Sequence, residues 1–239
     1  MEEGELNFMK NVIVFGGSGR IGSAIGKSLF SRENNYSIYN ADLENNWSLI
    51  PPYLSFIQCN ILNAFSVHNA LDFVQNTHGN IHAIIDCTYP RTKRYMKHPW
   101  YTQPLDDFST FWNMHLTRAV MLCQFAKEFN VRKVVLLSSM YGSIVPEEWV
   151  YEGSNVKRAP LEYCTSKAGL EHLVRYVSKD IHINAIAPSG IEDPSMDNIF
   201  KENYRKRYGE FTKVEDIAAL TEFLISENGQ GINGQVIHV

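Results

Sequence analysis

The sequence predicts an α/β fold, a doubly wound parallel sheet of about seven strands with helices on both faces. Short apolar runs alternate with longer stretches of helical periodicity, a rhythm typical of strand–helix–strand units with right-handed crossovers. Runs such as VVLL and AII are apolar without alternation, as expected for strands that helices cover on both faces. A glycine-rich turn after the first strand places a candidate ligand site at the edge of this sheet.

Seven segments have the apolar, β-branched character of strands. They are residues 11–16, 36–41, 54–59, 81–87, 131–139, 181–187 and 234–239. Helices are predicted near residues 20–31, 63–77, 105–129, 161–179 and 213–226. In the third of these helices large apolar residues recur at spacings of three and four, which indicates a broad apolar face suited to a core or a subunit contact.

No internal repeat, low-complexity tract or long linker divides the sequence, so residues 11–239 are predicted to form a single domain. Residues 1–10 are interpreted as an N-terminal extension, either disordered or foreign to the natural chain, because Met9 is a plausible natural start. Two irregular segments, 88–104 and 140–160, follow predicted strand ends. Loops of this length are usually functional or disordered, and ligands bind at the carboxyl edge of such sheets.

Composition argues against several classes of function. A formal net charge of −4 offers no basic face for nucleic acid and no polybasic patch for a membrane. No apolar stretch approaches the roughly 18–20 residues that span a bilayer, and the acidic N-terminus is unlike a secretion signal. The four cysteines form no C-x-x-C pair and the eight histidines show no ligand spacing. We therefore expect reduced thiols, a cytoplasmic location and no metal site.

The segment FGGSGRIG follows the first strand and opens a helix, with glycines at positions 16, 19 and 22. Gly16 permits a tight turn, Gly19 lets the backbone approach a pyrophosphate, and Gly22 lets helix and strand pack closely. The helix N-terminus then offers unpaired N–H groups to phosphate. A glycine triplet can also be only a flexible turn, but its place between a strand and a helix favours a Rossmann-type dinucleotide site.

Asp42 ends the second predicted strand, about where a dinucleotide site carries an acidic residue. A carboxylate there can accept both ribose hydroxyls and repels a 2′-phosphate, which favours NAD over NADP. The alternative is that Asp42 caps the next helix. Arg20, inside the glycine loop, has the charge to assist a 2′-phosphate and weakens the preference for NAD.

Tyr163 and Lys167 stand four residues apart in EYCTSKAG, a spacing that puts both side chains on one face of a helix. Tyr89 and Lys93 have the same spacing in YPRTK, but they lie in a loop that contains proline. EYCTSKAG opens a helix with an apolar face and follows the strand that ends at Ser139. The order of these elements therefore favours Tyr163 and Lys167 as the proton-transfer pair.

Five fragments together resemble the short-chain dehydrogenase/reductase family, over nearly the whole chain and in the family's order. They are VIVFGGSGRIG (12–22), FWNMHL (111–116), VVLLSSMYG (134–142), EYCTSKAG (162–169) and INAIAPSG (183–190). The resemblance implies an NAD(P)-dependent oxidoreductase that interconverts a carbonyl and a hydroxyl group by hydride transfer. DCTYPRTKRY (86–95) and SSMYGSIVPEEWVYEGSNV (138–156) resemble, more loosely, a subgroup found among surface-glycan and flagellin-sugar genes.

The resemblance implies four catalytic residues. Tyr163 would exchange a proton with the substrate oxygen, and Lys167 would lower the pKa of that phenol and hold the nicotinamide ribose. Ser139 would hydrogen-bond the substrate oxygen, and Asn113 would hold a water behind Lys167. The alternatives are that Ser139 only ends a strand and that Asn113 is an ordinary polar residue on a helix.

The resemblance also implies a set of cofactor contacts. They are Gly16, Ser18, Gly19, Arg20, Ile21, Gly22, Asp42, Asn60, Ile61, Cys87, Tyr163, Lys167, Pro188, Gly190 and Ile191. The chain departs from the family in places, since Asn60 stands where the family often has aspartate and DCTY replaces its NNAG turn. The separation of Ser139 from Tyr163 exceeds that of the short family form, which predicts an insertion near 144–160 over the substrate.

The substrate is expected to be a small anionic or sugar-like molecule. Arg91 and Arg94 are the predicted anion contacts and Tyr151 is a further candidate, although these positive charges can also form an ordinary solvated rim. A non-catalytic dinucleotide sensor and a sugar-nucleotide epimerase or dehydratase remain as alternatives to an oxidoreductase. The resemblance further implies a homodimer or homotetramer, with no nucleic-acid or membrane partner.

Overall fold

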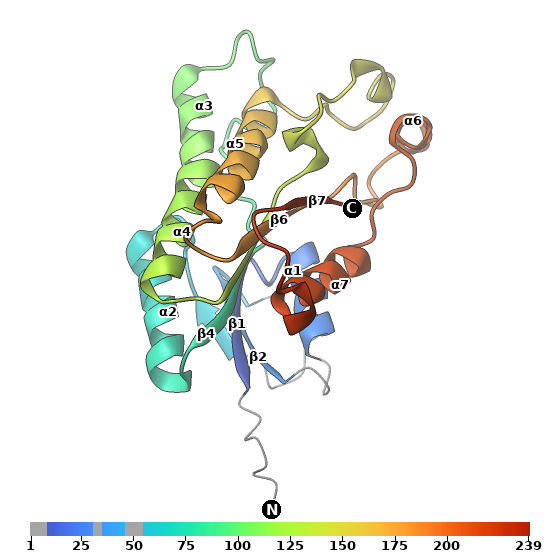
Figure 1. The fold of residues 1–239 in the computed structure, drawn as a ribbon. Coiled ribbons are helices and arrows are strands. Elements are labelled where there is room, and N and C mark those ends of the chain that lie inside the picture. The colour runs from blue at the N-terminus through green and yellow to red at the C-terminus, as the bar shows by residue number, and fades with distance from the viewer. Residues whose placement is uncertain (1–8, 31–34, 46–54) are drawn as a thin grey trace, which may run out of the picture.

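The computed structural model describes residues 9–30, 35–45 and 55–239. Seven strands form one parallel sheet in the order β3-β2-β1-β4-β5-β6-β7 (Figure 1). The strands are β1 (Lys10–Phe15), β2 (Tyr36–Asp42), β3 (Ser55–Gln58), β4 (Ile81–Asp86), β5 (Lys133–Leu137), β6 (Ile183–Ala187) and β7 (Val236–His238). The predicted fold class is therefore confirmed.

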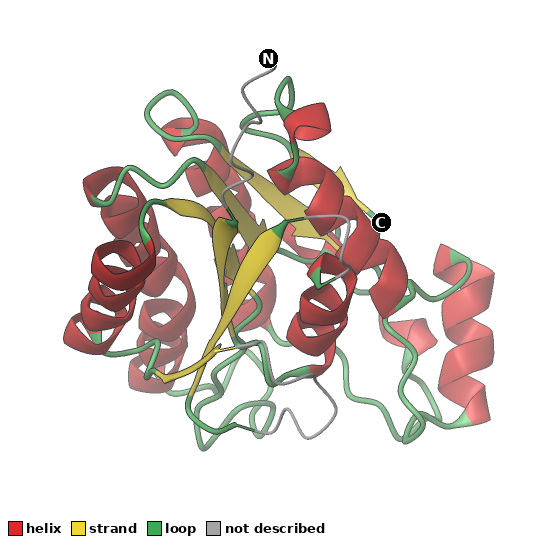
Figure 2. Cartoon of the chain, turned by 90° about the horizontal axis from the view of Figure 1, so that it is seen from below, coloured by secondary structure: helices red, strands yellow, loops and turns green. Residues whose placement is uncertain are grey.

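Helices cover both faces of this sheet, which lies between two helical layers in Figure 2. The helices are α1 (Arg20–Leu29), α2 (Ala64–His78), α3 (Leu105–Trp112), α4 (Arg118–Glu128), α5 (Leu161–Val177), α6 (Asn198–Tyr208) and α7 (Val214–Ile225). One apolar core joins the sheet to α2, α4 and α5, and a second joins the opposite face to α1 and α7. Every residue of β4, β5 and β6 is buried, which explains their continuous apolar sequences.

Two parts of the helical pattern differ from the sequence prediction. The helix expected at 105–129 is interrupted by a π-helical turn, Asn113–Thr117, between α3 and α4. Helix α6 was not predicted, because its sequence NIFKENYRKRY is mostly polar and buries only Phe200 and Tyr204. The predicted N-terminal extension is also too long, since Lys10 belongs to β1 and pairs with Tyr36. Residues 1–8 lie outside the described part of the chain.

The loops that follow β1, β4, β5 and β6 meet at the carboxyl edge of the sheet, where parallel α/β sheets bind ligands. Short 3₁₀ turns, Met140–Gly142 and Glu148–Val150, structure the long segment after β5. Within the described residues, no helix combines the length and apolar character needed to cross a membrane.

Candidate active site

The glycine loop brings three backbone segments into close contact. Gly16 has φ +74°, and a Cβ added to it would lie 2.9 Å from the Thr88 nitrogen at the end of β4. A Cβ on Gly22 would lie 2.3 Å from the Gly16 carbonyl oxygen. Gly19 is the N-cap of α1, and among the described residues no side chain caps this end of the helix. The loop therefore depends on glycine at two positions and leaves helical N–H groups available to an anion.

Asp42 lies beside the glycine loop at the end of β2. Its Oδ2 accepts a hydrogen bond from the Ser18 N–H at 3.0 Å, and its Oδ1 accepts one from the Leu43 N–H at 2.7 Å. The alternative that Asp42 caps the following described helix is wrong, because the N-cap of α2 is Asn63. The carboxylate thus contacts the loop that would hold a pyrophosphate.

Arg20 connects the glycine loop to the segment after β6. Its Nη2 donates to the Glu192 carbonyl oxygen at 2.6 Å, and its Nη1 lies 3.7 Å from Asp193 Oδ2. The guanidinium therefore spans the crevice between the β1 and β6 ends of the sheet.

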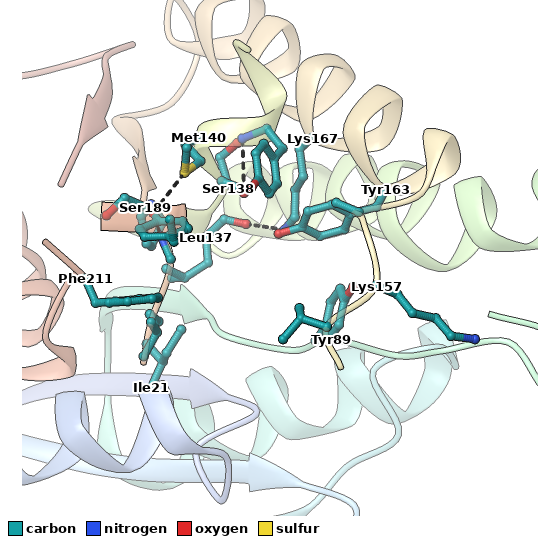
Figure 3. A pocket seen from close by; sticks show the side chains of 18 of the residues that line it. Ile21, Tyr89, Leu137, Ser138, Met140, Lys157, Tyr163, Lys167, Ser189 and Phe211 are labelled. Atoms are coloured by element: carbon teal, nitrogen blue, oxygen red, sulfur yellow. Dashed lines mark hydrogen bonds between the residues drawn. The ribbon is translucent and has the colours of Figure 1, made fainter. Parts of the chain in front are cut away.

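Ser139, Tyr163 and Lys167 meet in the structure as the sequence predicts. Ser139 follows β5, and its hydroxyl accepts a hydrogen bond from the Tyr141 N–H at 3.2 Å. Lys167 projects from the same face of α5 as Tyr163 (Figure 3), with Nζ 5.8 Å from the centre of the tyrosine ring. The Lys167 ammonium donates to the Leu137 carbonyl oxygen at 2.6 Å. All three side chains line one cavity of about 450 Å³.

Burial shifts the pKa values of Tyr163 and Lys167 in opposite directions. Desolvation raises the pKa of the Tyr163 phenol, and the hydrogen bond with Ser139 offsets part of that rise. Desolvation lowers the pKa of Lys167 to about 8. Near neutrality the phenol therefore holds its proton, and it becomes a base only where added positive charge lowers its pKa.

Asn113 does not reach this cluster. Its side chain is exposed, and its amide oxygen accepts a hydrogen bond from Thr117 Oγ1 at 3.2 Å. His115, two residues later, is buried instead, and Phe111 stacks on its ring at 4.2 Å. A π-turn begins at Asn113, and its added residue changes the direction of the side chains that follow.

His115 is neutral under ordinary conditions. Burial, followed by the charge of Lys167, lowers its pKa to about 3. Its Nε2 lies 2.8 Å from the Pro90 carbonyl oxygen, so Nε2 carries the proton and donates it. Its Nδ1 is a buried acceptor without a hydrogen-bond partner among the described residues.

The cavity runs from the glycine loop to the loops after β4, β5 and β6. The predicted residues that line it are Ile21, Cys87, Ser139, Tyr151, Tyr163, Lys167, Pro188, Gly190 and Ile191. Asn60 is exposed just after β3, where the Cys59 N–H donates to the Asp42 carbonyl oxygen at 2.8 Å. The Ile61 side chain packs in the core that includes α2, and it does not line the cavity.

Tyrosines build the wall of the cavity beyond Tyr163. Tyr89 meets the Tyr163 ring edge-on, with centroids 5.6 Å apart, and its hydroxyl is bonded to that of Tyr95. On another side Tyr141 and Tyr151 share a hydrogen bond of 2.5 Å between their hydroxyls. These rings come from the two irregular segments after β4 and β5. The position of those segments after strand ends was therefore the feature of the sequence that could have predicted this wall.

The predicted anion contacts Arg91 and Arg94 do not belong to this wall. Both are exposed, and the described residues that line the cavity include neither of them. The Arg91 guanidinium instead lies over the rings of Tyr89 and Tyr95, at 5.0 and 5.8 Å from their centres. Lys157, which sequence reasoning missed, does line the cavity; in Figure 3 its amino group points away from Tyr163, and it donates to the Met96 carbonyl oxygen at 3.2 Å.

Helix α6 closes the remaining side. The Gly190 N–H donates to the Tyr204 hydroxyl at 2.5 Å, and that hydroxyl contacts Met140 Sδ at 3.4 Å. A Cβ on Gly190 would lie 2.7 Å from the Tyr204 ring, so the ring seats directly on the backbone after β6. Among the described residues, no group of three or more His, Cys, Asp or Glu side chains is placed to hold a metal ion.

Comparison with known proteins agrees with this arrangement. A family model described as enoyl-(acyl carrier protein) reductase matches residues 41–239. The chain belongs to the short-chain dehydrogenase/reductase family. It is an NAD(P)-dependent oxidoreductase of that family, and the family predicted from the sequence is confirmed.

Individual relatives match most of the chain. The post-translational flagellin modification protein A of Campylobacter coli is 28% identical over 97% of both chains. A 3-oxoacyl-[acyl-carrier-protein] reductase of Aquifex aeolicus is 26% identical over 77% of this chain and 73% of that protein. A short-chain dehydrogenase from Leptospira borgpetersenii, solved with bound NAD+, has the same fold, with a TM-score of 0.82, 21% identity, and coverage of 96% of this chain and 91% of that one.

Proposed function

We propose that this protein interconverts a carbonyl and a hydroxyl group on a small sugar-like substrate, with Tyr163 as the acid/base. The observation that carries this proposal is that Ser139, Tyr163 and Lys167 line one cavity that reaches the glycine loop, with Lys167 Nζ 5.8 Å from the centre of the Tyr163 ring. The alternative of a non-catalytic sensor has less support, because such a protein would not need this arrangement of proton donors.

The residues present fit a nicotinamide dinucleotide, which supplies or accepts the hydride when it is bound. The uncapped N-terminus of α1 and the close backbone contacts of Gly16 and Gly22 suit a pyrophosphate. Asp42 would accept the adenosine ribose hydroxyls, which supports a preference for NAD over NADP. Ile21 and Ile191 line the cavity where the nicotinamide would lie.

In the direction of reduction, Tyr163 donates its phenolic proton to the substrate oxygen as that oxygen gains negative charge. Ser139 donates a second hydrogen bond to the same oxygen and stabilises the developing charge. Lys167, as an ammonium, stabilises the phenolate that remains. In the direction of oxidation each of these proton movements is reversed, and Tyr163 takes the proton of the substrate hydroxyl.

His115 lies two residues after Asn113 and is buried, whereas Asn113 is exposed. Its Nδ1 is a buried acceptor with no partner among the described residues, and the charge of Lys167 acts on its ring, so it suits a water molecule that would pass protons to the lysine. We therefore assign the water-holding role to His115, and His115→Phe in the assay below should reduce turnover more than Asn113→Ala does.

The substrate end of the cavity suits a hydroxylated ring. The hydroxyl pairs of Tyr89 with Tyr95 and of Tyr141 with Tyr151 offer hydrogen-bond partners, and their ring faces offer apolar contact. Lys157 and Lys167 are the only charged side chains among the described residues that line the cavity. We therefore expect any anionic group of the substrate to lie at the rim, near Lys157.

The decisive experiment is a turnover screen with NADH and NADPH over nucleotide sugars, carboxylated sugars, neutral sugars and acyl thioesters. The Tyr163→Phe variant keeps the ring and loses the phenolic hydroxyl, so we expect turnover to fall about 10²–10⁴-fold while cofactor affinity is unchanged. Undiminished turnover in this variant would contradict the mechanism, and preference for acyl thioesters would contradict the substrate class. Light scattering on the same sample tests the proposed homodimer or homotetramer.

A further inference from the structure

Glu171 is a buried carboxylate on α5 that the proposed mechanism does not use. It lies one helical turn after Lys167, and its side chain is only 4% exposed. Its Oε1 accepts a hydrogen bond from the Ser138 hydroxyl at 3.0 Å, and its Oε2 accepts one from the Ser143 hydroxyl at 2.8 Å. Among the described residues its only ion pair is a long one, with Arg175 Nη2 at 3.8 Å. Because a buried carboxylate needs partners in place of water, the two serine hydroxyls are its main support.

These two serines stand at the ends of the turn that follows β5. Between them lies the 3₁₀ turn Met140–Gly142, in which the Gly142 N–H donates to the Ser139 carbonyl oxygen at 2.9 Å. A Cβ on Gly142 would lie 3.0 Å from the Lys167 carbonyl carbon and closer still to Glu171 Oε1, so the turn packs directly on α5. Glu171 therefore holds both ends of this turn against the helix that carries the proton-transfer pair.

The same turn holds the hydroxyl of Ser139. The Tyr141 N–H donates to Ser139 Oγ at 3.2 Å, and this N–H belongs to the turn that Glu171 holds. Since Oγ is the acceptor in that bond, its own proton remains available to a substrate oxygen. The backbone here is fixed separately, because the Ser138 N–H donates to the Ile186 carbonyl oxygen of β6 at 2.7 Å. The direction of the Ser139 hydroxyl is therefore the property that depends on the turn.

We propose that Glu171 is a positioning residue, which acts through two serines to aim the Ser139 hydroxyl into the cavity. This proposal rests on the proposed function for its purpose, because Ser139 stabilises the charge that develops on the substrate oxygen. The hydrogen bonds themselves depend on no substrate. Without the carboxylate the turn is free to move away from α5, while the glycine loop that would bind the cofactor is untouched.

Amide hydrogen exchange on the protein without substrate tests the geometry. Glu171→Met keeps an unbranched side chain of similar length and removes both acceptors, so the amides of residues 141–144 should exchange about tenfold faster by NMR. Glu171→Gln keeps an amide oxygen for one serine and offers an N–H to the other hydroxyl, so it should restore most of the protection. Unchanged exchange of these amides in Glu171→Met overturns the proposal.

Arg175→Gln is the matched control. It removes the half-exposed cation that lies 3.8 Å from the carboxylate and leaves both serine bonds in place, so exchange and turnover should stay at the native values. If Arg175→Gln accelerates exchange as much as Glu171→Met does, charge rather than the serine bonds holds the turn, and the proposal fails.

A double-mutant cycle with Ser139 tests the consequence for catalysis. Glu171→Met should lower kcat roughly tenfold and leave NADH affinity unchanged, because it misdirects one donor to the developing charge. In the Ser139→Ala background the same substitution should cause no further fall in kcat, because no hydroxyl remains to be aimed. An equal fall in both backgrounds would show general damage to the fold and would overturn the proposal.

Ser143→Ala decides the question if Glu171→Met does not fold. Ser143 is exposed, and removing its hydroxyl breaks one of the two bonds to the carboxylate. The amides of residues 141–144 must then exchange faster for the proposal to stand. Because exchange is read without substrate, its failure remains distinguishable from a failure of the proposed function, which the Tyr163→Phe turnover assay detects.

Discussion

The cofactor half and the substrate half of the cavity are held together by different kinds of contact. In the cofactor half backbone packs on backbone, with a Cβ on Gly22 falling 2.3 Å from the Gly16 carbonyl oxygen. In the substrate half side chains from separate segments meet, as Tyr89, Tyr151 and Tyr204 do. The cofactor half therefore depends on glycines that let backbones touch, and the substrate half depends on contacts between side chains.

This difference predicts how each half responds to substitution. Where backbones touch, a single added methyl group has no space to occupy, so it must displace the chain or prevent the loop from forming. Where rings and hydroxyls line a cavity, removing one polar atom leaves the packing in place and changes only what is bound. Effects should therefore be large and shared by all substrates in the cofactor half, and smaller and specific to one substrate in the other.

The largest effect is expected for Gly22→Ala. The new Cβ would overlap the Gly16 carbonyl oxygen, so the glycine loop must shift and its phosphate-facing N–H groups lose their alignment. We expect about 1–3 kcal/mol of lost stability in urea unfolding and on the order of 100-fold weaker NADH binding by fluorescence titration.

Gly231→Ala is the matched control, because a Cβ there meets nothing within 4 Å. It should leave both stability and NADH affinity unchanged. Equal NADH affinity in Gly22→Ala and in the control would show that the cofactor half tolerates side chains, and the contrast between the two halves would fail.

A smaller effect is expected for Asp42→Ala. Losing a charged acceptor of the ribose hydroxyls should weaken NAD binding roughly tenfold to 100-fold, and losing its negative charge should strengthen NADP binding. Calorimetric titration with NAD and with NADP measures the ratio of the two affinities. Glu44→Ala, an exposed carboxylate two residues away, is the control and should change neither affinity. An unchanged ratio of NAD to NADP affinity in Asp42→Ala would show that Asp42 does not contact the cofactor.

The fold was accessible from the sequence because its strongest determinants are local and periodic. All seven predicted strands are present, and the fully buried β5 and β6 show the apolar runs that strands covered on both faces require. Helix α6 was missed because it buries only Phe200 and Tyr204 and is otherwise polar. The π-turn was missed because nothing in the spacing of apolar residues shows an added residue in a helical turn.

The candidate site divides in the same way. Glycine spacing and the Tyr163–Lys167 spacing were readable, because each describes neighbours in the chain. The tyrosine wall and the contacts of Glu171 with the turn after β5 were not, because the residues involved become neighbours only after folding. The exposed position of Asn113 was not readable for a related reason, since the direction of its side chain depends on the π-turn.

The smallest effects belong to the substrate half, where Tyr151→Phe and Arg91→Ala form a matched comparison. Tyr151 lines the cavity, and its hydroxyl bonds to the Tyr141 hydroxyl. Removing the Tyr151 hydroxyl should raise KM about 2–10-fold, the change expected when the substrate loses one hydrogen bond. Arg91 lies over two tyrosine rings without lining the cavity, so Arg91→Ala should leave KM within about twofold and cost about 0.5–1 kcal/mol of stability in urea unfolding. A rise in KM for anionic but not neutral substrates in Arg91→Ala would reverse this order. It would mean that the substrate extends beyond the tyrosine wall to the exposed cations, and that charge rather than ring packing selects it.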